Sequence, residues 1–142
     1  EVPVRITGRV DRVERDALGR FVIVDVKTGK NPITKQAAQD HAQLATYQVA
    51  AGAGGLNADA ETGEPGGARL VYVAKSGREG ATERLQTALD SEGIERWRQT
   101  IHEAAAATRG PGFEAVRNEG CRHCRVRGSC PAQDSGRQVT DR

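Results

Sequence analysis

Two apolar segments near the N-terminus each carry an acidic side chain, Asp11 in the first and Asp25 in the second. Asp25 stands between Val24 and Val26, so a carboxylate interrupts a run that otherwise predicts burial. A buried charge without compensation is costly, and Asp25 therefore requires a cation beside it, either Lys27 or a metal ion. Residues two apart in a strand share a face, which predicts that Asp25 and Lys27 lie together. With Asp11 on the paired strand, the three side chains are expected to form one cluster.

The second group of reactive side chains lies near the C-terminus, where all three cysteines fall within ten positions: Cys121, Cys124 and Cys130. A disulfide with one spare thiol is the simpler interpretation, but the chain has the character of an intracellular protein, where disulfides are uncommon. Metal or iron-sulfur ligation is therefore favoured. Such sites take four protein ligands. His123 is a poor fourth ligand for zinc because it lies between two close thiols, so a fourth ligand is expected upstream of Glu1.

Composition indicates a single soluble domain of moderate size: 142 residues, 28% of them charged, with a mean hydropathy of −0.61. No transmembrane segment or signal peptide is predicted, which favours a cytoplasmic location. The net charge is only +2, yet 17 of the 21 basic residues are Arg, whose planar fork suits phosphate oxygens. The chain contains no Met, and we expect it to be part of a longer polypeptide.

The elements expected to position these residues begin with a β-hairpin. Residues 2–15 alternate apolar and polar side chains as a half-buried strand does, and a turn at residues 16–20 leads into a second strand through Lys27. Thr34 is a plausible N-cap for a single helix over residues 35–51. One stripe of that helix is predicted to be buried and another face to carry polar groups. The buried stripe is Ala38, Ala42, Ala45 and Val49, and the polar face holds Gln36, Asp40, Gln43 and Tyr47.

The second half of the predicted fold repeats the pattern of strands followed by a helix. Residues 52–67 lack periodicity and predict a long exposed loop that is the first place to expect disorder. Strands are predicted at 68–74 and 82–87, and a helix begins after Asp90 or Ser91 and ends near Gly110. This order predicts a mixed α/β domain with helices packed on a central sheet.

Four motifs in this order resemble a known family. They are Gly8-x-x-Asp11, then Asp25-Val26-Lys27-Thr28-Gly29, then Gln43-x-x-x-Tyr47, then the cysteine tail ending in Cys130-Pro131. Together they resemble the RecB-type nuclease domain of the PD-(D/E)xK superfamily, and in particular the iron-sulfur nuclease modules of AddB- and AdnB-like helicase-nucleases. The resemblance implies a restriction-endonuclease-like core over residues 1–116, with a mixed central sheet flanked by helices. Residues 117–142 would form a cysteine-rich cluster-binding tail.

The resemblance also implies roles for the residues of the first two motifs. Asp11, Asp25 and the Val26 carbonyl would bind a catalytic Mg²⁺ or Mn²⁺, since hard cations prefer oxygen ligands. Lys27 would position the attacking water and stabilise charge in the transition state. The alternative for both acids is a structural ion pair, with Arg9 or Lys27 as the partner.

Two further roles follow from the resemblance for the helix that carries the third motif. Gln43 and Tyr47, one helical turn apart, would face the site and contact the DNA phosphate or the metal-binding loop. The alternative for Tyr47 is a core residue whose hydroxyl has a partner. His41 and His102 are expected to be surface or packing residues and not ligands.

In the resembling family the cysteine tail binds an iron-sulfur cluster. Cys121, Cys124 and Cys130 would supply three of the four ligands of a [4Fe-4S] cluster, with Zn²⁺ as the alternative. An early helix with an acidic or His ligand, and the first cluster cysteine, are expected upstream of Glu1.

The function implied is metal-dependent DNA hydrolysis, as an exonuclease more than an endonuclease, at the nuclease end of a bacterial helicase-nuclease that resects DNA ends. Its partners would be single-stranded DNA ends and helicase domains of the same polypeptide or of another subunit, with no membrane. Two alternatives stay open. One is a non-catalytic DNA-binding or scaffold module, and the other is a stand-alone resolvase or restriction-type nuclease.

Overall fold

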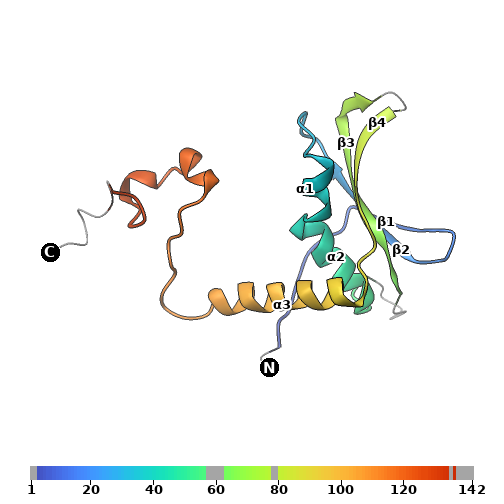
Figure 1. The fold of residues 1–142 in the computed structure, drawn as a ribbon, viewed down its shortest axis with the longest axis horizontal. Helices are drawn as coiled ribbons and strands as arrows, with labels where there is room; N and C mark the ends of the chain where they lie inside the picture. The colour runs from blue at the N-terminus through green and yellow to red at the C-terminus, as the bar shows by residue number, and fades with distance from the viewer. Residues whose placement is uncertain (1–2, 57–62, 78–79, 135, 137–142) are drawn as a thin grey trace. The chain divides into compact units, whose positions relative to one another are not determined.

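A computed structural model describes residues 3–56, 63–77, 80–134 and 136 of the chain. The chain divides into two compact units, residues 1–105 and residues 106–142. The first unit contains a four-stranded sheet in the order β1-β2-β3-β4. Its strands are β1 (Arg12–Arg15), β2 (Phe21–Lys27), β3 (Pro65–Gly77) and β4 (Gly80–Gln86). Helices α1 (Lys35–Gln39) and α2 (Ala42–Gly52) pack on one face of this sheet (Figure 1).

The sheet is mixed, as predicted. β1 pairs with β2 and β3 with β4 in antiparallel fashion, whereas β2 and β3 run parallel because the two helices connect them. Gly67 lies beside an irregularity in the β2-β3 register and has a φ of 109°, and a Cβ there would lie 2.9 Å from the Gln86 carbonyl oxygen. A side chain is therefore excluded at this position.

The turn between β1 and β2 is organised by Asp16. Its carboxylate accepts hydrogen bonds from the backbone N–H groups of Leu18 and Arg20, and its Oδ2 lies 2.8 Å from the Arg20 Nη2. Gly19 takes a φ of 76°, which the tight turn requires. The predicted hairpin is thus confirmed at residues 16–20.

The predicted first strand was too long. Residues 3–11 form no strand, and β1 begins at Arg12, opposite Val24. Continuing this register would place Val10 opposite Val26, but the Val26 N–H instead donates to the Asp11 carboxylate, 2.8 Å from Oδ2. A side chain has replaced the backbone acceptor at that point, and the ladder ends.

The predicted single helix over 35–51 is two helices with a break at Asp40 and His41. Thr34 is the N-cap of α1, as predicted, and its hydroxyl accepts from the Ala37 N–H. The break rotates α2 relative to one continuous helix. Ala42, predicted to be buried, is exposed, while Leu44 and Gln48 are fully buried. Ala38, Ala45 and Val49 are buried as predicted.

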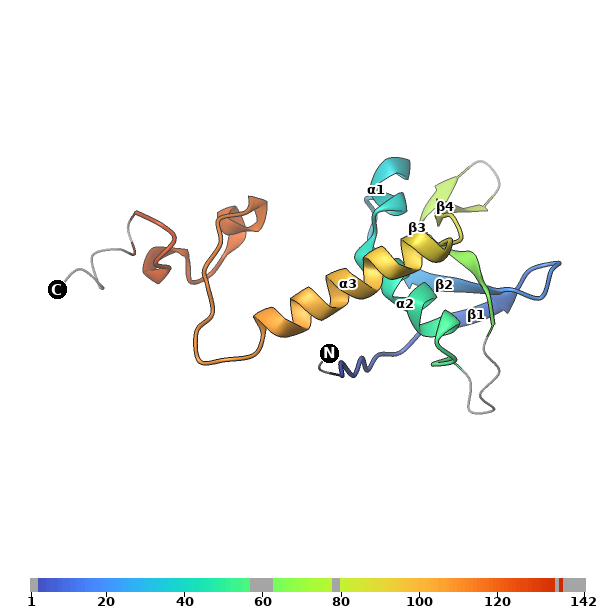
Figure 2. The same cartoon turned by 60° about the horizontal axis from the view of Figure 1, so that its bottom comes forward.

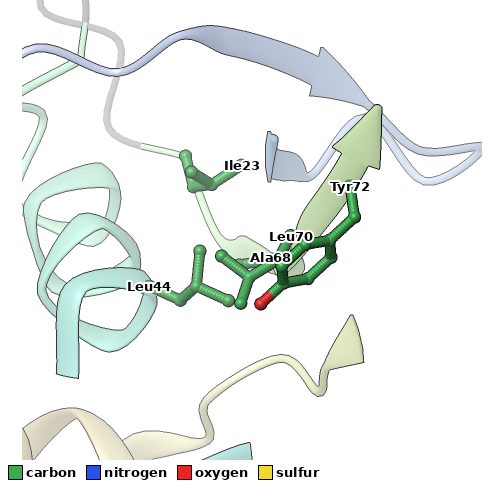
Figure 3. Close-up of a cluster of buried hydrophobic side chains, with 5 residues drawn as sticks. All are labelled: Ile23, Leu44, Ala68, Leu70 and Tyr72. Atoms are coloured by element: carbon green, nitrogen blue, oxygen red, sulfur yellow. The ribbon is translucent and has the colours of Figure 1, made fainter. Parts of the chain in front are cut away.

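The core lies between the sheet and α2. Ile23 of β2 and Leu44 of α2 are fully buried against Ala68, Leu70 and Tyr72 of β3 (Figure 3). Ala68, Leu70 and Tyr72 occupy alternate positions of β3, so they share the face that α2 covers. Burial of this cluster fixes α2 against β2 and β3, the two strands beside the predicted site.

The remaining elements follow the predicted order. β3 contains the strand predicted at 68–74, and β4 begins two residues before the strand predicted at 82–87 and ends one residue before its predicted end. Helix α3 (Ser91–Ala107), seen end to end in Figure 2, is preceded by Asp90, whose carboxylate accepts from the Gly93 N–H at 2.7 Å. The predicted loop over 52–67 is shorter, because β3 begins at Pro65, and its residues 57–62 lie outside the described part of the chain. None of the described helices is long and apolar enough to cross a membrane.

The second unit contains two short 3-10 helices, η1 (Glu119–His123) and η2 (Arg127–Ser129). Asn118 caps η1 through its side chain, which accepts from the Gly120 N–H. Arg117 donates to the Ala132 carbonyl and forms an ion pair with Asp134, 2.9 Å between nitrogen and oxygen. These contacts join the two ends of the cysteine-bearing segment within this unit.

Candidate active site

Asp25 is the centre of the candidate site. It lies on the helix-covered face of β2 and is only 4% exposed. Its Oδ1 accepts a hydrogen bond from Gln43 Nε2 at 3.0 Å, and its Oδ2 lies 2.7 Å from Lys27 Nζ. The predicted pairing of Asp25 with Lys27 is therefore present. The Lys27 contact lacks hydrogen-bond geometry, and Asp25 Oδ2 has no hydrogen-bond partner in the described part of the chain.

Gln43 joins the acid and the base of the site. It is the second residue of α2, and its Oε1 accepts from Lys27 Nζ at 3.0 Å while its Nε2 donates to Asp25. A carboxamide can serve both partners because it carries a donor and an acceptor on one planar group. Gln43 thus fixes the relative positions of a buried carboxylate and a half-buried ammonium group.

Tyr47 links α2 to the N-terminal motif. Its hydroxyl donates to the Arg9 carbonyl at 2.9 Å and accepts from Gln43 Nε2 at 3.3 Å. Its ring packs against the core cluster, and a Cβ on Gly8 would lie 3.7 Å from it. The ring thus packs against the core and the hydroxyl has protein partners, as the alternative interpretation of Tyr47 expects. Its contact with a DNA phosphate or the metal-binding loop stays a prediction.

Asp11 is placed differently from Asp25. Its side chain is exposed, and its Oδ2 accepts from the N–H of Val26, the residue between Asp25 and Lys27. Hydrogen bonds and one ion pair thus connect all five side chains predicted for the site to one another, to β2 or to the N-terminal motif. Those residues are Asp11, Asp25, Lys27, Gln43 and Tyr47.

His41 was expected to be a packing or surface residue, and the structure adds a relation to the site. It occupies the N-cap position of α2 without a side-chain cap hydrogen bond, and it is half-buried, with a buried Nδ1 that has no hydrogen-bond partner among the described residues. Burial lowers its pKa below the usual 6.5, and the positive charge of Lys27 lowers the pKa further, while Asp25 acts in the opposite direction. In the sequence, the only indication that His41 lies near the site is its position two residues before Gln43, at the start of a helix.

The chemistry of these donors fits a hard divalent cation. Asp25 offers a buried carboxylate oxygen that lies beside Lys27 and accepts no hydrogen bond from the described residues, and the Asp11 carboxylate accepts from the Val26 N–H. No set of three or more His, Cys, Asp or Glu side chains in the described part of the chain is gathered as a metal site. A cation held by these two acids would need carbonyl oxygens, water or substrate to complete its coordination.

The comparison with known families is decisive at this point. The family model for the PD-(D/E)XK nuclease superfamily matches residues 1–131. The chain belongs to the PD-(D/E)XK nuclease superfamily. The α/β fold and the mixed four-stranded sheet with helices packed against it agree with the core of this superfamily. Membership indicates phosphodiester hydrolysis on a DNA substrate, and a divalent metal is typical of these nucleases. No curated protein matches the chain.

The cysteines of this PD-(D/E)XK chain are all free: Cys121 in η1, and Cys124 and Cys130 immediately after the two short helices. The Asn118 N–H donates to the Cys121 sulfur at 3.3 Å. The thiols are not gathered into a ligand group in the described residues, so their arrangement does not yet fit a cluster or a zinc ion.

Proposed function

We propose that this chain is a metal-dependent DNA nuclease, and that Asp25 is its principal metal-binding residue. The observation that carries the proposal is the buried Asp25 carboxylate, which keeps one oxygen without a hydrogen bond beside Lys27. Its Oδ2 lies 2.7 Å from the Lys27 ammonium group, and a carboxylate oxygen has a further lone pair that a hard cation can use. A divalent cation would satisfy that oxygen.

Each residue of the site would have a different role in the reaction. Asp25 and Asp11 would hold Mg²⁺ or Mn²⁺ with the Val26 carbonyl, and the ion would polarise the scissile phosphate and lower the pKa of a bound water. Lys27 would place its ammonium group against the charge that develops on the phosphate oxygens. Gln43 keeps Lys27 and Asp25 in register, and Tyr47 holds α2 against the segment that carries Asp11.

The test uses the protein, a 5′-labelled single-stranded DNA and Mg²⁺. Asp25→Asn and Lys27→Gln should each lower kcat by roughly 10²-fold or more, the scale for losing one electrostatic contact to the transition state. Both changes are close to the parent in size, and circular dichroism of each variant checks that it is folded, because each breaks the ion pair between Asp25 and Lys27. Glu83→Gln on β4 is the control, since its carboxylate lies 3.6 Å from Arg69 and apart from the site contacts. Unchanged cleavage by Asp25→Asn would refute the assignment.

We propose further that the nuclease acts on DNA ends as part of a cytoplasmic helicase-nuclease. Residues 1–116 would form the nuclease core and residues 117–142 the metal-binding tail. The order and spacing of the four motifs support this proposal. Linear and circular single strands of one sequence separate the modes, because an exonuclease degrades only the linear form. A stand-alone resolvase would instead cut the circle or a branched duplex.

A non-catalytic DNA-binding module is the second candidate. The observation that favours it is the ion pair between Lys27 and Asp25, which would let the site persist without a metal. The two candidates differ in a direct measurement. A scaffold would bind labelled DNA and leave it intact in Mg²⁺ and in Mn²⁺, whereas the proposed nuclease would shorten it.

For the tail we propose iron-sulfur ligation by Cys121, Cys124 and Cys130, with zinc as the alternative. The support is the spacing of three free thiols with a proline directly after the last. Because the thiols do not yet converge, cluster binding would have to draw them together. Iron, sulfide and zinc assays on anaerobically purified protein decide between the metals. Cys124→Ser should release the metal, and zinc without iron would exclude the cluster.

A further inference from the structure

A buried chain of carboxamides lies behind the candidate active site, outside the residues that the motifs contain. Gln86, the last residue of β4, is 3% exposed, and Gln48 of α2 is fully buried. Gln48 Nε2 donates to Gln86 Oε1 at 2.9 Å, and Gln48 Oε1 accepts from the Leu89 N–H at 3.0 Å. Burying a polar group without a hydrogen-bond partner is costly. The hydrogen bonds that these two carboxamides make therefore indicate a structural role.

The hydrogen bonds of the Gln86 side-chain Nε2 show what this role is. Its Nε2 lies within hydrogen-bond distance of three backbone carbonyl oxygens: Ala38 at 3.2 Å, Gln39 at 2.9 Å and His41 at 3.2 Å. These carbonyls flank the break between α1 and α2. The Ala38 and His41 carbonyls also accept backbone N–H groups, from His41 and Ala45. The Gln86 side chain therefore adds a donor from the sheet that ties the end of α1 to the start of α2.

The break determines where α2 begins, and Gln43 is the second residue of α2. A continuous helix through residues 40 and 41 would place the following side chains at a different rotation, as the exposure of Ala42 and the burial of Leu44 illustrate. Gln43 contacts Asp25 and Lys27 only from its present angle.

We propose that Gln86 is a positioning residue of the active site. By holding the break between α1 and α2, its carboxamide sets the start of α2 and keeps Gln43 against Asp25 and Lys27. This inference rests on the proposed nuclease function, but it concerns a residue that touches neither metal nor DNA. It explains why the polar side chain of Gln86 is buried between β4 and the two helices.

The test is a double-mutant cycle between Gln86 and Gln43. Gln86→Met keeps the length and the unbranched shape while removing the donors. Alone it should lower kcat by about tenfold, the low end for losing an outer-shell partner, with KM within about twofold. In the Gln43→Ala background the same change should cost less than about twofold, because its effect passes through Gln43.

Gln39→Ala is the matched control. The Gln39 side chain also joins the first helix to the end of β4, through the Leu85 carbonyl and the Thr87 N–H, and neither of these hydrogen bonds involves α2. Its kcat should stay within about twofold of the parent, as is usual for a partly exposed polar side chain. An equal loss from Gln86→Met in both backgrounds, or no loss in either, would overturn the proposal.

A readout independent of catalysis separates this inference from the proposed function. The side-chain amide resonances of Gln43 report its contacts with Asp25 and Lys27, and they should shift in Gln86→Met but not in Gln39→Ala. If the parent protein cleaves no DNA while these shifts appear, the nuclease assignment fails and the positioning role stands. Should Gln86→Met lose its circular-dichroism signal, Gln86→Asn, which retains a shorter amide, takes its place in the cycle and in the spectra. Unmoved Gln43 resonances in a folded variant would refute the positioning role.

Discussion

The carboxylate of Asp11 accepts a hydrogen bond from the backbone N–H of Val26, with 2.8 Å between Asp11 Oδ2 and the Val26 nitrogen. This bond stands where the β1-β2 ladder would otherwise continue, because β1 begins one residue later opposite Val24. Asp11 therefore has a structural contact as well as a proposed role at the metal. The hydrogen bond from Val26 requires only an acceptor oxygen on residue 11, whereas a divalent metal prefers a negatively charged oxygen.

Asp11→Asn and Asp11→Ala separate these roles. Asn keeps an acceptor for Val26, so we expect the free energy of unfolding to stay near that of the parent, while Ala should lower it by about 1 kcal/mol. Both changes should reduce cleavage and raise the Mg²⁺ concentration needed for half-maximal rate, because both remove the charge. Urea unfolding and a Mg²⁺ titration of activity measure the two effects. Full activity in Asp11→Asn would leave Asp11 with the structural contact alone.

The pKa of His41 should report the charges of the site. Burial and then Lys27 hold this pKa below 6.5, and Asp25 opposes them. Lys27→Gln should therefore raise the pKa of His41, and Asp25→Asn should lower it further. Titration of the His41 imidazole resonances by NMR measures both changes. Identical His41 titrations in all three proteins would show that its environment is insensitive to the site.

The same shift has a consequence for stability. The native state binds the His41 proton less readily than the unfolded chain does, so protonation favours unfolding. The contribution of His41 to the free energy of unfolding is complete above pH 6.5 and declines as the pH falls below that value. His41→Gln should remove this part of the pH dependence. Urea midpoints of both proteins, measured from about pH 7.5 down to about pH 5, test it.

Two Leu→Ala substitutions, one in the core and one at the surface, should lower the free energy of unfolding by different amounts. Leu44 is fully buried between α2 and the sheet, whereas Leu18 at the hairpin turn is 77% exposed. Leu44→Ala should lower the free energy of unfolding by about 2–5 kcal/mol, through lost transfer energy and the cavity that remains. Leu18→Ala should change it by less than about 0.5 kcal/mol. Comparable losses for the two would contradict the assignment of Leu44 to the core.

Much of the fold could be predicted from the sequence because hydrophobic alternation and capping residues are local signals. The hairpin at residues 16–20, the Thr34 cap and the start of α3 at Asp90 each depend on residues only a few positions apart in the chain. The same holds for the pairing of Asp25 with Lys27, since strand geometry alone places them on one face.

What could not be predicted depends on contacts distant in sequence. The helix break at Asp40 and His41 contains neither Gly nor Pro, and Gln86, 45 residues after His41, supplies the donors at that break. The early end of β1 likewise depends on Asp11 reaching Val26, a pair 15 residues apart. Helix propensity and alternation carry no information about either contact.

The arginines of the tail give the last prediction. Arg122, Arg125 and Arg127 are all exposed along η1 and η2, while Arg117 is engaged by Asp134. If the exposed arginines bind DNA phosphates, each contact releases counterions, and affinity falls with salt. Replacing Arg122 and Arg125 by Gln should then weaken binding to unrelated sequences alike and reduce the slope of log K against log salt by about 1 to 2. Fluorescence anisotropy over a range of NaCl concentrations measures that slope. Arg98→Gln on α3, an exposed arginine of the first unit, is the control for a general loss of charge. An unchanged slope in the double variant, or an equal loss in the control, would show that the arginines of the tail do not form the phosphate-binding surface.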